Sequence, residues 1–230
     1  MRRLMRHLIL LVILCGLFLS NCTKDEHVLI VISPHASEQE QLAAREIRRF
    51  LYHRTDQLID IVKSDSLPSG DHALVLLGTI EQPIFKAGEF ELAPQSYILK
   101  SNNIDNRHLL YIVGGDTDGV LYGAYRFTEH YGVRFYLHGD VIPDKKIPLK
   151  LPKLDEFREP LFELRGIHPF HDFPEGPDWW NLDDYKAVLA QLPKMGMNFF
   201  ALHTYPDNQP FQGEQKGPEP VVWIGQESDI

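Results

Sequence analysis

The sequence predicts a protein of the α/β class, because strand-like and helix-like segments alternate along the chain. Residues 28–32 form a continuous run of valine, leucine and isoleucine. Such a run is typical of a strand that is buried on both faces of a sheet. Residues 37–54 place apolar side chains at helical spacing and charged side chains on the other face. A second helical pattern covers residues 120–131, and together these patterns predict a small α/β sandwich over residues 27–145.

Further elements of this first domain follow from local patterns. Strands are expected at residues 58–62, 73–77, 96–100 and 109–113. The second helix buries one face, formed by Val120, Ala124, Phe127 and Tyr131. Gly123 lies within that helix, where glycine costs about 1 kcal/mol relative to alanine. We therefore expect the helix to approach the sheet closely at Gly123, and we expect Gly132 to form a left-handed cap.

A second pattern starts after a proline- and lysine-rich stretch, residues 146–160, which is typical of a linker. A strand is expected at residues 162–167, then a helix capped by Asn181 and ended by Pro193, then a strand at residues 197–202. This order is one βαβ unit of a parallel sheet. A (β/α)8 barrel needs about 250 residues. Residues 161–230 therefore fit only the truncated first βαβ unit of such a barrel.

The N-terminus predicts export. Basic residues precede an apolar run from Leu8 to Leu19, which is shorter than the roughly 20 residues that cross a bilayer. The alternative is an anchor helix that stays in the membrane. Residues 19–22, Leu-Ser-Asn-Cys, resemble a bacterial lipobox. We expect a signal peptide over residues 1–21, lipidation of Cys22, and a tether over residues 22–26 that is either an export signal or a plain solvated segment. The expected location is the outer membrane or cell surface, otherwise the periplasm.

The cysteine count and the net charge restrict the classes of partner that the protein can bind. The two cysteines, Cys15 and Cys22, leave the mature chain without a disulfide. Removing residues 1–21 takes away three arginines and no acidic residue, which shifts the net charge from −9 to −12. This charge disfavours nucleic acid and anionic membrane surfaces as partners. A neutral polysaccharide or oligosaccharide remains compatible, and the membrane contact is expected through the lipid anchor alone.

Three stretches carry a family resemblance. They are Gly-Val-Leu-Tyr-Gly-Ala-Tyr-Arg-Phe at residues 119–127, the segment from Glu163 to Trp180, and the segment from Lys194 to Pro206. Together they resemble the N-terminal α/β domain and the start of the catalytic barrel of α-glucuronidase-like and hexosaminidase-like glycoside hydrolases, in a Bacteroidetes-type lipoprotein. The resemblance implies a role in polysaccharide degradation.

Candidate substrate-binding residues lie where the barrel strands would end, because barrel chemistry sits at the carboxyl ends of the strands. The candidates are His168, His171, Asp172, Trp179, Trp180, His203 and Tyr205. Histidine and aspartate side chains there can hydrogen-bond sugar hydroxyls, and tryptophan rings can stack on a pyranose. The competing interpretation is that these residues cap loops or pack over the barrel.

No catalytic residue is assigned. Glycoside hydrolysis uses two carboxylates about 5–9.5 Å apart, and neither Glu163 nor Glu175 has an evident partner. The resemblance implies that the catalytic acids come from later strands. Residues 114–119, Gly-Gly-Asp-Thr-Asp-Gly, lack the spacing of a nucleotide loop, and His171 with His203 does not form a zinc motif. We therefore expect no nucleotide, metal or cofactor.

Two functional hypotheses remain. In the first, the chain is the N-terminal part of a carbohydrate-degrading glycoside hydrolase, inactive by itself. In the second, it is a non-catalytic, lipid-anchored module that binds carbohydrate or another partner. The tail from Pro218 to Gly225 is similar to barrel-family loop sequence, which favours the first hypothesis.

Overall fold

The computed structural model describes residues 27–85, 88–169 and 176–202. The first domain is built on a six-stranded mixed sheet with the strand order β2-β1-β3-β5-β4-β8. These strands are β1 (Val28–Ile32), β2 (Asp60–Lys63), β3 (Ala73–Thr79), β4 (Tyr97–Ile104), β5 (Arg107–Gly114) and β8 (Asp155–Arg158). The first four in the order run parallel, and β4 is antiparallel to both β5 and β8. The predicted α/β class is confirmed.

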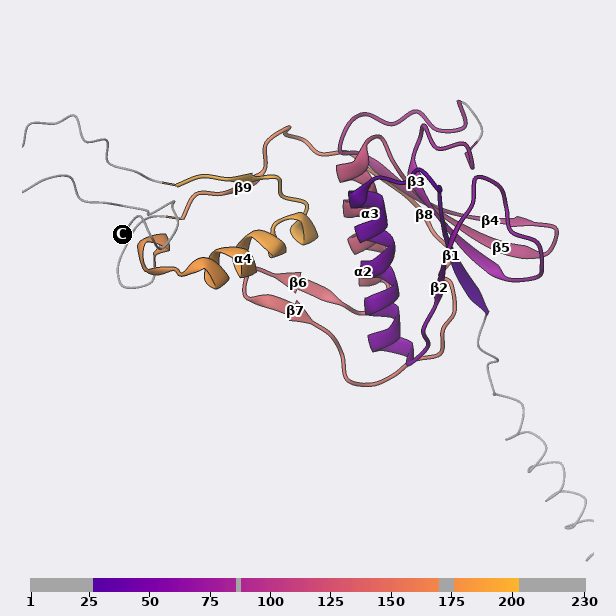
Figure 1. The fold of residues 1–230 in the computed structure, drawn as a ribbon, viewed down its shortest axis with the longest axis horizontal. Helices are drawn as coiled ribbons and strands as arrows, with labels where there is room; N and C mark the ends of the chain where they lie inside the picture. Colours follow the sequence, from indigo (N-terminus) through magenta and orange to yellow (C-terminus); the bar gives the residue numbers. More distant parts are fainter. Residues whose placement is uncertain (1–26, 86–87, 170–175, 203–230) are drawn as a thin grey trace, which may run out of the picture.

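Two helices, α2 (Glu38–Thr55) and α3 (Thr117–Glu129), lie side by side on one face of this sheet (Figure 1). Ile47 and Phe50 from α2 and Phe127 from α3 are fully buried against sheet residues such as Ile30. The opposite face has its own apolar cluster, in which Leu74, Leu76 and Tyr111 pack against Phe85 and the segment around it. Every residue of β1 is buried, as the apolar run predicts for a strand covered on both faces.

Helix α3 approaches the sheet closely, and its glycines explain how. A Cβ on Gly123 would lie 3.1 Å from Cγ2 of Ile112 on β5. A Cβ on Gly119 would overlap the carbonyl oxygen of Ser96. The expected close contact at Gly123 is therefore confirmed, and Gly119 makes a tighter one. Gly132 has a φ of +88°, the left-handed conformation expected after the helix.

Residues 146–160 differ from the predicted linker, because they pack on the first domain. Leu149 and Leu151 are buried in the helix-side core. Strand β8 then pairs with β4 from Tyr97↔Arg158 to Lys100↔Asp155. The proline content masks an alternation of apolar and polar residues, which is the pattern of an extended segment with one buried side. A short hairpin, β6 (Arg134–Tyr136) and β7 (Gly139–Val141), precedes this segment.

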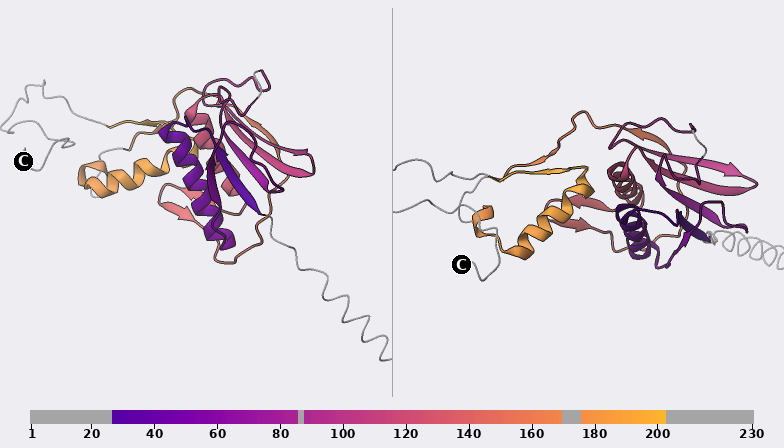
Figure 2. Two further views of the ribbon diagram at one scale, coloured as in Figure 1. Left: turned by 45° about the vertical axis from the view of Figure 1, so that its right-hand side comes forward. Right: turned by 45° about the horizontal axis from the view of Figure 1, so that its top comes forward.

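The second region lies beyond the helices, on the side away from the sheet (Figure 2). It contains β9 (Gly166–Ile167), η1 (Pro177–Trp179), α4 (Leu182–Gln191), η2 (Pro193–Met195) and β10 (Phe199–Phe200). Asn181 caps α4 through a capping box with Asp184, and the helix ends before Pro193, as predicted. Among the described helices, none is long and apolar enough to cross a membrane.

Candidate functional site

The two short strands of the second region define the first candidate site. Strands β9 and β10 pair in parallel, with Phe199 opposite Gly166 and Phe200 opposite Ile167. Gly166 is required here, because a Cβ would overlap the carbonyl oxygen of Phe199. Parallel strands end at the same edge of their sheet. The residues that follow them, His168 and Ala201, therefore lie on one edge, which we name the strand-end edge.

Two adjacent tryptophans, Trp179 and Trp180, lie just before α4 and have different environments. The ring of Trp180 lies 5.3 Å from that of Tyr185 and 6.4 Å from that of Phe200, measured between centroids. The hydroxyl of Tyr185 donates a hydrogen bond of 2.9 Å to the carbonyl of Pro177. Trp180 thus packs within the second region, whereas Trp179 beside it is 65% exposed. Trp179 is therefore the more accessible of the two rings.

The structure locates three of the seven predicted sugar-binding residues. His168 is exposed directly after β9, and Trp179 and Trp180 lie before α4. The other four, His171, Asp172, His203 and Tyr205, lie outside the described residues, as does Cys22. Within the described ranges, no group of three or more histidine, cysteine, aspartate or glutamate side chains is arranged to hold a metal ion.

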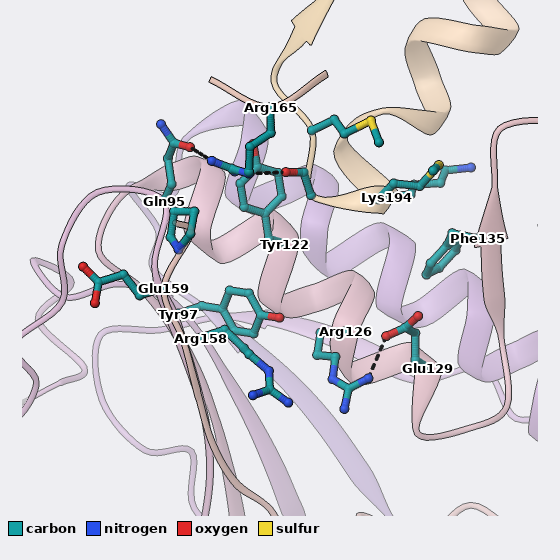
Figure 3. Close-up of a pocket in the computed structure, with 14 residues that line it drawn as sticks. Gln95, Tyr97, Tyr122, Arg126, Glu129, Phe135, Arg158, Glu159, Arg165 and Lys194 are labelled. Atoms are coloured by element: carbon teal, nitrogen blue, oxygen red, sulfur yellow. Dashed lines mark hydrogen bonds and ion pairs between the residues drawn. The ribbon is translucent and has the colours of Figure 1, made fainter. Parts of the chain in front are cut away.

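A groove of about 560 Å³ lies at the opposite edge, where β9 and β10 begin (Figure 3). Its walls come from α3, the start of β4, the end of β8, and the turn at η2. The lining includes Tyr97, Tyr122, Arg126, Arg158, Arg165 and Lys194. The lining residues come from both regions, so we assign this groove to the junction between them. The strand-end edge remains the candidate site that the sequence predicted.

Arg165 is the centre of that junction. Its guanidinium donates hydrogen bonds to the side-chain oxygen of Gln95 at 2.7 Å and to the carbonyl of Gly196 at 2.8 Å. It also lies 5.6 Å from the ring centroid of Tyr122 on α3. The side-chain amide of Asn198 donates to the same Gln95 oxygen at 3.1 Å. This network ties the starts of β9 and β10 to the first domain.

A second connection is an ion pair shielded from solvent. The ammonium of Lys194, on η2, lies 2.9 Å from both carboxylate oxygens of Asp140 on β7. The two side chains are 10% and 15% exposed. Arg49 of α2 also reaches Asp140, at 3.4 Å. Because a desolvated charge needs a partner, these contacts hold η2 in one position on the first domain.

Burial and ion pairs shift the pKa values of groups in and beside the groove. Burial raises the pKa of Tyr97 to about 12, so its hydroxyl keeps its proton at neutral pH. Hydrogen bonds to Glu156 and Glu129 raise the pKa of Arg126. Burial acts to raise the pKa of Glu156, but Arg126, with His130 and Arg158, holds it below its ordinary value. In this part of the groove, Arg126 is thus paired with Glu129 and Glu156 beside the neutral hydroxyl of Tyr97.

Comparisons with known proteins agree with this architecture. Residues 19–127 match the family model described as the glycosyl hydrolase family 67 N-terminus. Among solved structures, the family GH115 4-O-methyl-alpha-glucuronidase BtGH115A, described as specific for decorated arabinogalactans, is similar with a TM-score of 0.57 and 17% identity. The similarity covers 78% of this chain and 25% of that enzyme. No curated protein matches the chain.

A second solved structure is a GH138 enzyme targeting pectin rhamnogalacturonan II. Its TM-score is 0.46 at 11% identity, and the similarity covers 78% of this chain and 24% of that one. The chain therefore spans about a quarter of the length of these enzymes.

The predicted resemblance is confirmed for the N-terminal domain. Residues 19–127 are similar to the glycosyl hydrolase family 67 N-terminus, and the chain shares its fold with part of a GH115 enzyme. This similarity connects the chain with carbohydrate degradation. The junction residues Gln95 and Asn198 had no signal in the sequence, because their contact joins positions 103 residues apart.

Proposed function

We propose that the chain is the N-terminal part of a carbohydrate-degrading, α-glucuronidase-like glycoside hydrolase. In this proposal, residues 161–230 form the first βαβ unit of its (β/α)8 barrel. One observation carries it: β9, α4 and β10 form a parallel strand–helix–strand unit, docked on a domain that matches the family 67 N-terminus. That order of domains is the one expected from the resemblance.

The strand-end edge is the part of the proposed barrel that would contact sugar. Trp179 offers an exposed ring for stacking, and His168 follows β9 at the same edge. His171, Asp172, His203 and Tyr205 remain predicted sugar contacts. A barrel site draws catalytic residues from several different strands. Two strands out of eight therefore supply only part of the site, and we propose that this chain alone does not complete catalysis.

The proposed location is the outer membrane or cell surface, with Cys22 carrying the lipid. Strand β1 begins at Val28, six residues after that cysteine. Six extended residues span at most about 20 Å, so the first domain would lie close to the membrane. Replacing Cys22 by Ala should release the protein from the membrane fraction and lower its mass by the acyl chains. Unchanged fractionation and mass would contradict lipidation.

The activity proposal is tested with the chain itself. Aryl glycosides and glucuronoxylan oligosaccharides should give background rates, because acid and base cannot both be placed around the scissile bond. Turnover that survives purification and is lost in Asp172→Asn or Glu175→Gln would contradict the proposal. The DNA that follows the codon for Ile230 provides the complementary test. Barrel sequence there supports the enzyme, whereas an unrelated gene supports the alternative of a lipid-anchored carbohydrate-binding module.

A further inference from the structure

A cavity of about 380 Å³ lies between the two regions, apart from the groove around Arg165. One wall is the tip of the β6–β7 hairpin of the first domain, and the other is η1 with the outer side of α4. Its lining consists of Leu137, His138, Trp179, Trp180, Asp184, Ala187 and Val188. Its volume falls within the range of about 300–1,000 Å³ that is usual for small-molecule sites.

The apolar part of this cavity presents an aromatic face to solvent. Trp179 is 65% exposed and Leu137 is 42% exposed. Exposed large apolar residues that gather in a concavity mark a binding surface more often than scattered ones do. Trp180 is held in place by the ring of Tyr185 at 5.3 Å, so the floor beside Trp179 is fixed.

The polar part consists of two side chains with restrained positions. The imidazole of His138 stacks on the ring of Tyr136, with centroids 5.4 Å apart and an interplanar angle of 11°. One oxygen of Asp184 accepts the backbone N–H of Asn181 at 3.0 Å as part of the helix cap. A carboxylate accepts about four hydrogen bonds, so Asp184 retains capacity for further donors.

An exposed aromatic ring beside a carboxylate and an imidazole indicates the class of ligand. A pyranose has one apolar face of C–H bonds and a rim of hydroxyls, which match an aromatic ring flanked by a carboxylate and an imidazole. An acidic sugar would place its carboxylate near Asp184 and be repelled. Among glycans, neutral ones therefore fit this cavity best.

We propose that the cavity binds a neutral pyranose unit of a glycan chain, with Trp179 stacking on the ring and His138 and Asp184 contacting its hydroxyls. This inference rests on the proposed function for the class of ligand. It goes further by giving the first domain a direct role in binding, through the hairpin tip that carries His138.

Affinity electrophoresis of the full chain in detergent tests the proposal. Gels contain neutral β-1,4-galactan or β-1,4-xylan, with polygalacturonate as the acidic comparison. We expect a neutral glycan to slow the wild-type chain and polygalacturonate to leave it unchanged. Trp179→Ala and His138→Ala should each raise the apparent dissociation constant by at least about fivefold, as expected for an interface anchor. Tyr52→Ala, an exposed aromatic on α2 outside the cavity, is the matched control and should bind normally.

The outcomes separate this inference from the proposed function. If Trp179→Ala abolishes binding and His138→Ala does not, the strand-end site stands and the role of the hairpin is wrong. If both variants bind like the wild type, the cavity is not the site. If no neutral glycan slows the wild type, both the inference and the sugar contacts of the proposed function are contradicted. Unchanged melting temperatures of the variants exclude misfolding as the cause.

Discussion

The first domain and residues 161–202 both contain clear helix and strand patterns in the sequence. The apolar residues of these patterns are buried to very different extents in the two regions. In the first domain, apolar residues on both faces of the sheet are fully buried. In the second region, α4 has no buried residue, and Leu161, Phe162 and Leu182 are among the most exposed apolar residues described. Amphipathic periodicity indicates which face of an element seeks a partner. It does not indicate whether that partner is present.

The contacts that attach the second region to the first domain also differ in kind from the contacts within the first domain. The first domain depends on apolar burial, which contributes about 25 cal/mol per Å². The second region is attached mainly through charged and amide side chains, centred on Arg165 and on the Lys194–Asp140 pair. Such contacts fix the geometry of the attachment, and each contributes about 0.5–3 kcal/mol. Substitutions in the two regions should therefore have very different effects.

The largest contrast is expected between Ile47→Ala in α2 and Leu189→Ala in α4. Ile47 is fully buried, and deleting its side chain should lower the free energy of unfolding by about 2–5 kcal/mol. Leu189 is 43% exposed, and its loss should change stability by no more than about 0.5 kcal/mol. Urea unfolding monitored by far-UV circular dichroism measures both. Equal effects would contradict the contrast between the regions.

A smaller contrast is expected within α3. Gly123→Ala gains about 1 kcal/mol of helix propensity in the interior of α3, and Gly119→Ala gains less because it lies in the first turn. The new methyl group at position 119 would overlap backbone, the Ser96 carbonyl, whereas at position 123 it meets the side chains of Ile112 and Tyr97 at 3.1 Å and 3.4 Å. We expect Gly119→Ala to destabilise by about 1–3 kcal/mol, in the range of overpacking, and Gly123→Ala to be close to neutral. A reversed order in thermal unfolding would show that the helix does not rest on Ser96.

These glycines also show how much of the fold the sequence could predict. The cost of glycine within a helix indicated a close contact at Gly123, and the structure confirms it. Strand β1, both helix faces and the cap at Asn181 follow from periodicity and capping rules. Residues 146–160 were mispredicted as a linker, because their prolines outweighed the alternation of buried Leu149 and Leu151. Composition describes a segment by itself, whereas burial depends on what lies opposite.

The candidate site was less predictable for the same reason. The rule that barrel chemistry lies at strand ends selected His168, Trp179 and Trp180. It could not separate the packed Trp180 from the exposed Trp179, because that difference depends on Tyr185 and Phe200. It also gave no indication of His138, which reaches the same cavity from another domain.

Arg165→Ala should loosen the second region while leaving the first domain intact. The substitution removes two of the contacts that position β9, those to Gln95 and Gly196. Hydrogen bonds to a charged group contribute about 1.5–3 kcal/mol each, so amide exchange in α4 should accelerate by roughly tenfold or more. Exchange in β1 and β5 should not change. Arg158→Ala, a more exposed arginine of the same groove, is the control, and an equal effect there would argue against a specific role for Arg165.

The smallest effect is expected for Glu156→Gln, and it should depend on pH. Glu156 joins β8 to α3 through Arg126 at 3.0 Å and His130 at 2.9 Å. Although burial acts to raise the pKa of Glu156, its interactions with Arg126, His130 and Arg158 hold that pKa below the ordinary value of 4.5. A carboxyl group whose pKa is lowered by folding stabilises the protein above its unfolded-state pKa, and that contribution is lost as the pH falls through the folded-state pKa. The free energy of unfolding of the wild type should therefore exceed that of Glu156→Gln near neutral pH. The difference should be less than about 1 kcal/mol, because the Glu156–Arg126 pair is partly solvated. The difference should shrink as the pH falls below 4.5.

Glu81→Gln, at an exposed position, should show no such trend. Urea unfolding of the three proteins from pH 7 to pH 3 measures it, and a difference that grows toward low pH would mean that Glu156 is not held ionised by Arg126.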